Sequence, residues 1–231
     1  MTDLHTHILP CVDDGCGSYD IAISMLEEEK AQGVTRVVLT PHLRGRYNMP
    51  DDAVRAAFAE FASDPRVRAV GVELYLGREI AVRTPRDVEN KSLMTLGNGK
   101  CVLIELPYDD LTDVEELVYN IRIAGYKAVL AHIERFVYTQ DIPLVERLKQ
   151  RGALIQVNAR SLMDKTFKDE YKFARKLIKE KLVDVVASDV HFGRINYMAK
   201  AYNFVAKKDK AYADRIFDTI PYSLLGRLCR K

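Results

Sequence analysis

The sequence lacks the features expected of a membrane-spanning, secreted or strongly charged protein. None of its 231 residues belong to a stretch approaching the ~20 uninterrupted apolar residues that a membrane helix requires. Its four cysteines are not paired at zinc-site spacings, and four thiols in a chain of this size do not suggest a disulfide scaffold. Lys and Arg number 35 against 33 Asp and Glu, so overall charge gives no reason to expect a nucleic-acid partner. We therefore expect a cytoplasmic protein with reduced thiols, without membrane insertion and without bound nucleic acid.

Two common phosphate-handling motifs are also missing. A cysteine-dependent phosphatase needs an arginine six positions after its nucleophile, but the residues six positions after Cys11, Cys16 and Cys101 are Gly17, Ala22 and Pro107. No Gly-x-x-x-x-Gly-Lys loop is present, and Gly97-Asn-Gly99 indicates a turn before a strand. These absences exclude a cysteine nucleophile and leave kinase or nucleotide-switch roles without support.

Short β-branched runs alternate with longer amphipathic segments along the chain. This alternation is typical of βαβ units around a parallel sheet. We expect seven strands: Thr2–His7, Val34–Thr40, Val67–Tyr75, Cys101–Leu106, Lys127–His132, Ala153–Asn158 and Val183–Ser188. Helices are expected over Ser18–Gln32, Asp52–Ala62, Asp113–Ala124, Pro143–Arg151, Phe167–Glu180 and from about Asn196 onward. No repeat or linker divides the chain, so residues 1–231 are expected to form one α/β domain.

Most side chains able to hold a transition metal lie at or just beyond the expected carboxyl end of a strand. They are His5, His7, Asp14, His42, Glu73, Glu105, His132, Asp189 and His191. One strand-end histidine alone is more often a structural residue than a ligand. However, strand ends converge on one face of a parallel barrel, and a carboxylate in an apolar run is costly to bury without a partner. The whole set therefore predicts a shared metal site.

The same residues occur in an ordered series of motifs that resembles the polymerase-and-histidinol-phosphatase (PHP) superfamily. The motifs are Asp3-Leu-His-Thr-His, Val12-Asp-Asp-Gly, Thr40-Pro-His, Gly71-Val-Glu, Leu103-Ile-Glu, Ala131-His-Ile-Glu-Arg, Gln156-Val-Asn and Ala187-Ser-Asp-Val-His. They span nearly the whole chain. Ala-His-Ile-Glu-Arg and Gln-Val-Asn most resemble the bacterial manganese-dependent protein-tyrosine phosphatases of the CpsB/YwqE capsule and exopolysaccharide type.

The resemblance implies a distorted (β/α)7, TIM-like barrel that holds three divalent metals on the nine residues named above. It also implies hydrolysis of phosphotyrosine, on a bacterial tyrosine kinase, by attack of a metal-bridging hydroxide. Nitrogen and oxygen ligands suit Mn, Fe or Zn, with Mn expected from the resemblance. Three dications would exceed the four carboxylate charges by two and would attract a phosphate dianion.

Five further residues are candidates for contacts with the substrate. Arg135 and Arg194 match positions where the family places phosphate-contacting arginines, and a guanidinium fits phosphate oxygens well. Arg44, Arg46 and Tyr47 lie in the loop 43–51, which is rich in Arg, Gly, Asn and Pro and is a candidate lid. The alternative interpretation of these three is a solvated basic loop with a tyrosine that packs on the barrel.

Three other functions share parts of this pattern. A histidinol phosphatase would use the same metals, but Asp109 and Asp110 are not enough to establish a pocket for its substrate amine. A metal-dependent amidohydrolase also begins with His-x-His, but it usually uses a bridging lysine where this chain has glutamates. A non-catalytic PHP module is disfavoured because no predicted ligand is lost.

Overall fold

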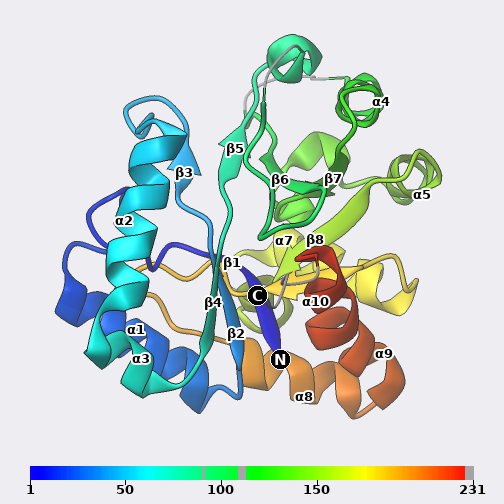
Figure 1. Cartoon of the computed structure of the whole chain (residues 1–231). Coiled ribbons are helices and arrows are strands. Elements are labelled where there is room, and N and C mark those ends of the chain that lie inside the picture. The colour runs from blue at the N-terminus through cyan, green and yellow to red at the C-terminus, as the bar shows by residue number, and fades with distance from the viewer. Residues whose placement is uncertain (90–91, 109–112, 227–231) are drawn as a thin grey trace.

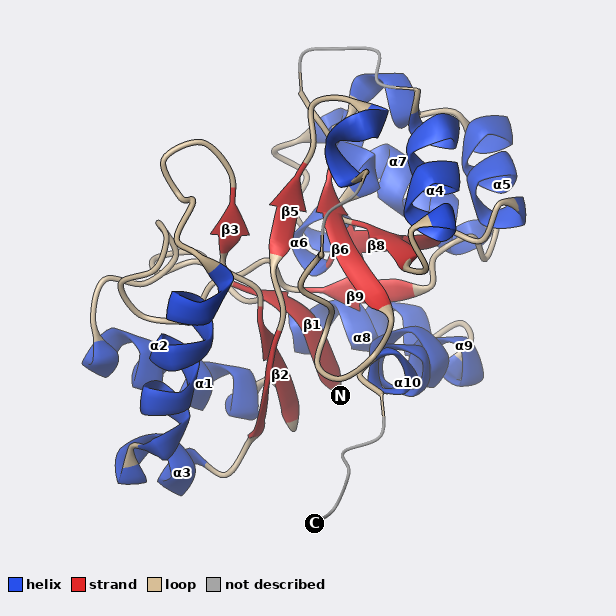
Figure 2. Ribbon diagram, turned by 45° about the horizontal axis from the view of Figure 1, so that its top comes forward, coloured by secondary structure: helices blue, strands red, loops and turns tan. Residues whose placement is uncertain are grey.

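The strands form one curled parallel sheet, with helices around its outside (Figures 1 and 2). The computed structural model describes residues 1–89, 92–108 and 113–226, so Asp109 and Asp110 lie outside the described residues. The strands are β1 (Thr2–Thr6), β2 (Arg36–Leu39), β3 (His42–Leu43), β4 (Glu73–Leu76), β5 (Glu79–Ala81), β6 (Cys101–Glu105), β7 (Lys127–Leu130), β8 (Leu154–Asn158) and β9 (Val185–Ala187).

The strands named above occupy seven positions in the sheet, because two of these positions each hold a strand that is interrupted and continues as the next one. β2 continues as β3, and β4 continues as β5, after a break of two residues in each case. The first halves pair in the order β1-β2-β4, whereas the second halves pair in the order β3-β5-β6-β7-β8-β9. A parallel bridge between Thr6 and Val190 joins β1 to the segment after β9. The ring of seven positions confirms the predicted distorted (β/α)7 barrel.

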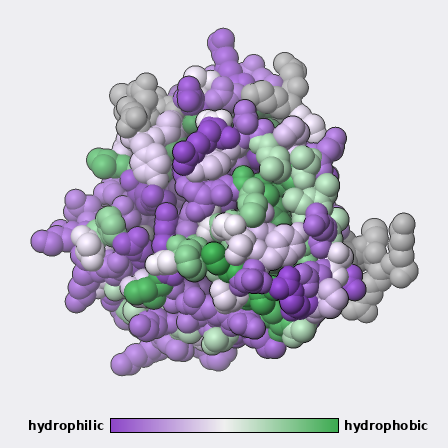
Figure 3. All heavy atoms as spheres, turned by 90° about the vertical axis from the view of Figure 1, so that its left-hand side faces the viewer, coloured by the Kyte–Doolittle hydropathy of each residue, from purple (hydrophilic) through white to green (hydrophobic). Residues whose placement is uncertain are grey.

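Helices cover the outer face of this sheet, apart from α10 (Ile220–Leu224), which packs against one end of the barrel interior. They are α1 (Tyr19–Ala31), α2 (Asp51–Ser63), α3 (Pro65–Val70), α4 (Val114–Ile123), α5 (Ile142–Gln150), α6 (Ala159–Met163), α7 (Lys168–Lys179), α8 (Met198–Ala206), α9 (Lys210–Asp214) and α10 (Ile220–Leu224). Shorter 3-10 turns are η1 (Pro85–Val88), η2 (Ile133–Arg135) and η3 (Val137–Thr139), and a π-helix, η4, spans Arg215–Thr219. The face formed by α1 to α3 is mostly hydrophilic, with smaller hydrophobic patches (Figure 3).

Side-chain caps begin several of the helices close to the predicted positions. Ser18 accepts a hydrogen bond from the amide of Ile21 at the start of α1, and Asp113 accepts one from Glu116 at the start of α4. Gly33, with φ of 85°, follows the end of α1 and allows the chain to turn back toward β2. The predicted crossover helices are therefore confirmed to within a few residues.

The expected strand Val67–Tyr75 is wrong in its first half, where the chain forms α3. Asp64 caps this helix by accepting a hydrogen bond from the Arg66 amide, and Pro65 occupies its first position. Gly71 ends the helix in the left-handed conformation, with φ of 79°. These start and stop signals outweigh the β-branched composition, so the strand begins only at Glu73 and extends further along the chain.

The barrel interior changes from apolar to polar along its axis. Toward the amino ends of the strands, the interior is filled by buried side chains that include Leu4, Val38, Leu103, Val129 and Val185. Ile220 and Leu224 of α10 pack against this cluster and cover that end. Polar and ionisable side chains occupy the other end of the interior, at the carboxyl ends of the strands. This is the face on which parallel α/β barrels carry their active sites. No helix among the described residues has the length and apolar character needed to cross a bilayer.

Candidate metal centre

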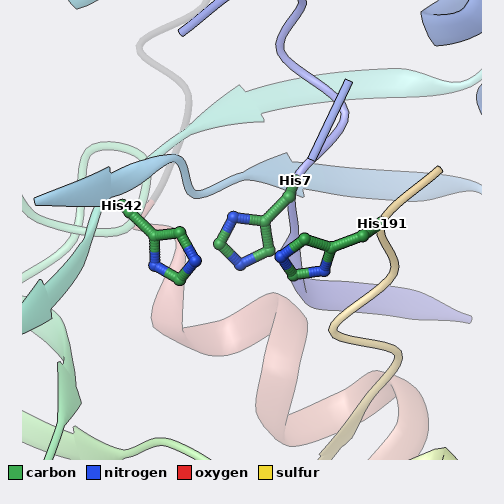
Figure 4. A group of neighbouring side chains, drawn as sticks. All are labelled: His7, His42 and His191. Carbon is green, nitrogen blue, oxygen red and sulfur yellow. The ribbon is translucent and has the colours of Figure 1, made fainter. Parts of the chain in front are cut away.

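All five histidines converge at the carboxyl ends of the strands. His5 and His7 come from β1 and its end, and their Nε2 atoms lie 3.1 Å apart. The His7 ring lies between those of His42 and His191, with ring centroids 4.2 and 4.1 Å away (Figure 4). His132 completes the group, with its ring centroid 5.5 Å from that of His5. All five imidazoles are buried, and the structure brings them together at one place.

A carboxylate that the sequence analysis missed, Glu79, lies at the centre of this group. One oxygen, Oε1, lies 2.8 Å from His132 Nε2 and 3.3 Å from His5 Nε2. The other, Oε2, lies 2.6 Å from His42 Nδ1 and 3.4 Å from His7 Nε2. Glu79 is fully buried, so its carboxylate contacts four imidazoles and no solvent.

The expectation that Glu73 lies in the site is wrong. Glu73 begins β4 at the amino end of the barrel, where its side chain is 62% exposed and lies 3.7 Å from Arg36. The physical reason is the position of the strand, which starts at Glu73 instead of ending near it. Six residues further along, the continuation as β5 brings Glu79 to the carboxyl end. The helix signals of Asp64-Pro65 and Gly71 could have revealed this shift.

The other three predicted carboxylates do approach the histidines. Asp189 Oδ1 lies 3.4 Å from His7 Nε2 and 3.6 Å from His5 Nε2. The turn after β1 brings Asp14 Oδ1 to 3.4 Å from His42 Nε2, and Glu105 at the end of β6 lies 4.0 Å from His132 Nε2. Eight of the nine predicted ligands therefore gather, with Glu79 in the ninth place.

Asp13, beside the predicted Asp14, orients two of the histidines. Its carboxylate accepts hydrogen bonds from His7 Nδ1 at 2.7 Å and from the His42 amide at 2.9 Å. The bond to Nδ1 directs the Nε2 atom of His7 toward the centre of the site. Gly15 is required in this turn, because a Cβ atom there would lie only 2.1 Å from the Cβ atom of His7.

Strand β8 contributes no predicted ligand, but two of its side chains hold ligands from three other strands. Gln156 Oε1 lies 3.2 Å from His5 Nδ1 and accepts a hydrogen bond from the His132 amide at 2.9 Å. Its amide nitrogen donates to Asn158 Oδ1 at 2.8 Å. Asn158 in turn donates to Asp189 Oδ2 at 2.9 Å. The Gln-Val-Asn motif therefore links β1, β7 and β9 beneath the site.

The backbone at two predicted ligands is strained. His132 has φ of 31° and Asp189 has φ of 52°, which are left-handed conformations that non-glycine residues adopt at a cost of about 1–3 kcal/mol. Gln156 accepts a hydrogen bond from the His132 amide, and Asn158 donates one to the Asp189 carboxylate. The polar groups of β8 therefore help to hold the two ligands in orientations that the chain would not otherwise favour.

Burial and neighbouring charges set different protonation states for the predicted ligands. Burial lowers the pKa of His132, and burial together with the charge of His7 lowers the pKa of His191 to about 3, so both imidazoles are neutral at pH 7. Burial alone would raise the pKa of Glu79, but the charge of His5 and the contact with His132 hold it well below its ordinary value. Burial would lower the pKa of His5 and His7, but the nearby Glu79 and Asp13 carboxylates raise the pKa of these two imidazoles, so both must lose a proton before they bind cations.

Several buried atoms of the site lack a hydrogen-bond partner among the described residues. They are both ring nitrogens of His42, Nδ1 of His132 and Oε2 of Glu79; the 2.6 Å approach of His42 Nδ1 to Glu79 Oε2 lacks hydrogen-bond geometry. Buried polar atoms without partners are costly, and bound divalent cations would satisfy the nitrogen and oxygen donors that face one another here. The donor set contains no sulfur, which suits Mn, Fe or Zn. The residues present therefore fit a metal centre.

The two predicted phosphate-binding arginines line one small cavity beside Asp189. The cavity has a volume of about 70 Å³ and lies between Arg135, Arg194 and Asn158, among other residues. Arg135 Nη1 lies 3.3 Å from Asp189 Oδ2, which places its guanidinium at the edge of the metal ligands. The structure thus brings both arginines together at the site.

The predicted substrate residues of the loop 43–51 lie on another side of the centre. Arg44 donates hydrogen bonds to both oxygens of Glu105, at 3.0 and 3.1 Å. Two backbone hydrogen bonds between Arg44 and Tyr47 close a tight turn, and the Tyr47 ring is stacked at 6.0 Å from His42. Arg78, which is fully buried, donates to the carbonyl oxygen of His42 at 2.8 Å and thereby fixes the start of the loop. Movement of this loop as a lid stays a prediction.

Comparison with known proteins gives one consistent set of relatives. Residues 1–226 match the family described as "Capsular polysaccharide synthesis, CpsB/CapC". The chain is 32% identical to the putative tyrosine-protein phosphatase CapC of Staphylococcus aureus, with 94% of this chain and 87% of that protein covered. It is 33% identical to the tyrosine-protein phosphatase CpsB of Streptococcus pneumoniae, with 90% of each chain covered.

A solved structure agrees with these relatives. Crystal structures of YwqE from Bacillus subtilis and CpsB from Streptococcus pneumoniae, described as unique metal-dependent tyrosine phosphatases, include a chain similar to this one. The TM-score is 0.81 and the identity 29%, over 97% of this chain and 91% of that chain. The phosphotriesterase homology protein of Escherichia coli, at 9% identity and a TM-score of 0.58, shares the fold alone.

Proposed function

We propose that the chain, which belongs to the CpsB/CapC capsular polysaccharide synthesis family, is a metal-dependent protein-tyrosine phosphatase. Its relatives bear that activity in their names, and the similar solved structure is described as metal-dependent. The observation in this chain that carries the proposal is the buried Glu79 carboxylate in contact with four imidazoles, beside a cavity lined by two arginines.

The proposed centre binds three divalent metals, with manganese as the expected ion. Its ligands are His5, His7, Asp14, His42, Glu79, Glu105, His132, Asp189 and His191. Bound there, the ions would supply Lewis-acid chemistry by activating water and neutralising phosphoryl oxygens. Glu79 takes the position in this set that Glu73 was expected to hold.

Protein side chains would bind and orient the phosphate. Arg135 and Arg194 line the same cavity, and their guanidinium groups match the oxygens of a phosphate dianion. Asp189 lies beside Arg135 and holds its guanidinium near the ligands. The leaving group is a phenolate with a parent pKa near 10, which needs less protonation than an alkoxide, so no dedicated general acid is required.

The biological setting is part of the same proposal. The substrate is a phosphotyrosine protein, and we expect a bacterial tyrosine kinase that controls capsule or exopolysaccharide synthesis. We expect the protein to act on this substrate in the cytoplasm.

A substrate panel tests the proposed activity. Manganese-loaded protein is supplied with a phosphotyrosine peptide, a phosphoserine peptide of the same sequence and L-histidinol phosphate, and phosphate release is measured with and without a chelator. We expect the phosphotyrosine peptide to be hydrolysed with the highest kcat/KM, and the chelator to abolish the reaction. Faster hydrolysis of histidinol phosphate would contradict the proposed substrate but leave the metal centre intact.

A further inference from the structure

Two large apolar side chains are exposed at the cavity that Arg135 and Arg194 line. Phe167 and Ile195 are among its lining residues, with 43% and 66% of their surface exposed. Phe167 directly precedes α7, and Ile195 lies in the segment between β9 and α8. Single exposed apolar residues are normal on a surface, whereas apolar side chains that share a cavity with convergent polar groups are typical of ligand sites.

The rest of this cavity is mostly polar. Its charged lining residues are Arg135, Arg160, Arg194, Glu170 and Asp189. Arg135 pairs with Asp189 at 3.3 Å, so this part of the lining lies at the metal ligands. A ligand that fills the cavity therefore needs an anionic group for the guanidiniums and an apolar group for the two exposed side chains.

The ring of Phe167 is held in place although it is partly exposed. The Arg160 guanidinium lies over the ring, 4.4 Å from its centroid, and Asp164 fixes Arg160 through an ion pair of 3.1 Å. Asp164 also accepts a hydrogen bond from the Thr166 amide at 2.9 Å, directly before Phe167. An aromatic ring that is already ordered loses little conformational freedom when a second ring packs against it.

Ile195 is positioned in a similar way by its neighbours in the chain. Asn196 is buried and donates a hydrogen bond to Glu29 Oε1 at 2.6 Å. On the other side, the Arg194 amide donates to the carbonyl oxygen of His191 at 3.1 Å. These bonds fix the backbone before and after Ile195, so its exposed side chain is presented at the cavity.

We propose that Phe167 and Ile195 contact the phenyl ring of phosphotyrosine and so make the protein prefer aryl over alkyl phosphates. This inference rests on the proposed phosphatase function, in which Arg135 and Arg194 bind the phosphate. A phosphotyrosine carries its ring directly on the ester oxygen, so the ring lies next to the bound phosphate. Tyr47 is a less suitable partner, because its ring already stacks on His42 and lines a separate groove.

Two phosphonates that the protein cannot hydrolyse test the ring contact. Benzylphosphonate carries a phenyl ring and methylphosphonate carries none, and their dissociation constants for the manganese-loaded protein are measured by calorimetry. We expect the wild type to bind benzylphosphonate about tenfold more tightly, and Phe167→Ala and Ile195→Ala each to lower this ratio about threefold or more. Because both ligands carry the same anionic group, the ratio cancels changes in phosphate or metal binding.

Ile123→Ala is the matched control for Ile195→Ala. Ile123 is the last residue of α4, is 67% exposed and is not one of the residues that line the cavity. The control should keep the wild-type ratio. Equal affinities of the wild type for the two phosphonates would overturn the inference. A ratio that falls in Tyr47→Ala but in neither cavity variant would also overturn it.

Hydrolysis of a phosphotyrosine peptide, measured on the same proteins, separates failure of this inference from failure of the proposed function. We expect kcat/KM to fall in both cavity variants by about the same factor as the affinity ratio. Hydrolysis by a wild type that binds both phosphonates equally would support the phosphatase and contradict the ring contact. A ring-dependent affinity that the variants lose, without hydrolysis of the peptide by the wild type, would contradict the phosphatase and support the ring contact.

Discussion

Glu79 provides a sharp prediction because the sequence contains a matched control in the same interrupted strand. Glu79→Gln keeps the shape of the side chain but removes its charge at the centre of the site. The carboxylate lies 2.6–3.4 Å from nitrogens of four imidazoles, so any cation held there would be close to it. Glu73→Gln makes the same chemical change at the opposite end of the barrel, where the side chain is mostly exposed.

The expected size of the effect follows from electrostatics. A unit charge pair separated by about 4 Å interacts by ~4 kcal/mol at an effective dielectric constant of about 20. Loss of this interaction corresponds to about a thousandfold weaker binding of a cation. Glu73→Gln, by contrast, should change stability by no more than about 0.5 kcal/mol, since it alters an exposed surface residue.

The assay measures manganese content and phosphatase activity after dialysis against a fixed free manganese concentration. Glu79→Gln should lose most of its bound metal and its activity, while circular dichroism shows that the fold is retained. Glu73→Gln should match the wild type in all three measurements. Full metal content and activity in Glu79→Gln would refute the argument, and so would a metal loss confined to Glu73→Gln.

Three further predictions concern residues outside the proposed ligand set. Gln156→Ala should weaken manganese binding by about 10- to 100-fold in calorimetric titration, because His5 and His132 lose a common partner; unchanged affinity would contradict this role. Burial and the charge of Asp3 raise the pKa of Glu29 well above 4.5, so the folded chain retains a proton that the unfolded chain loses. The free energy of unfolding should therefore fall as pH rises above about 4.5, by up to ~1.4 kcal/mol per pH unit. Denaturant titrations of Glu29→Gln should show a smaller fall in the free energy of unfolding with rising pH than the wild type shows. An equal fall in both proteins would exclude Glu29 as the source of this pH dependence. The double substitution Cys11→Ser, Cys16→Ser should retain phosphatase activity, whereas its complete loss in a folded protein would revive a thiol mechanism.

The histidines of the site could be predicted from the sequence because they come directly after short, regular strands. In β1, the alternation of side chains determines the relation of His5 to His7, and the strand ends close to its predicted position. His132 and Asp189 also lie next to strands that the composition identifies correctly. For these residues, local pattern and three-dimensional position agree.

Glu79 could not be predicted from strand composition alone, because its position depends on an interruption of the sheet. The two-residue break after β4 moves the chain from one set of strand partners to another. A Cβ atom at Gly77 within this break would lie 2.7 Å from the Leu96 side chain, so close packing shapes the break. Packing between distant segments thus decides which glutamate reaches the centre.

The supporting roles of Asp13, Gln156 and Asn158 also required the structure. The resemblance identified their motifs, but their hydrogen bonds join segments that are far apart in the sequence. Gln156, for example, lies 151 residues from His5. Such contacts depend on barrel closure, which no local sequence pattern encodes.

Stepwise metal titration shows whether phosphotyrosine hydrolysis depends on this metal centre. Metal-free protein is titrated with manganese, and bound metal and phosphate release from a phosphotyrosine peptide are measured at each step. We expect no hydrolysis without metal, a rise with manganese, and saturation when three ions are bound per chain. Hydrolysis by the metal-free protein, or metal binding that restores no hydrolysis, would contradict it.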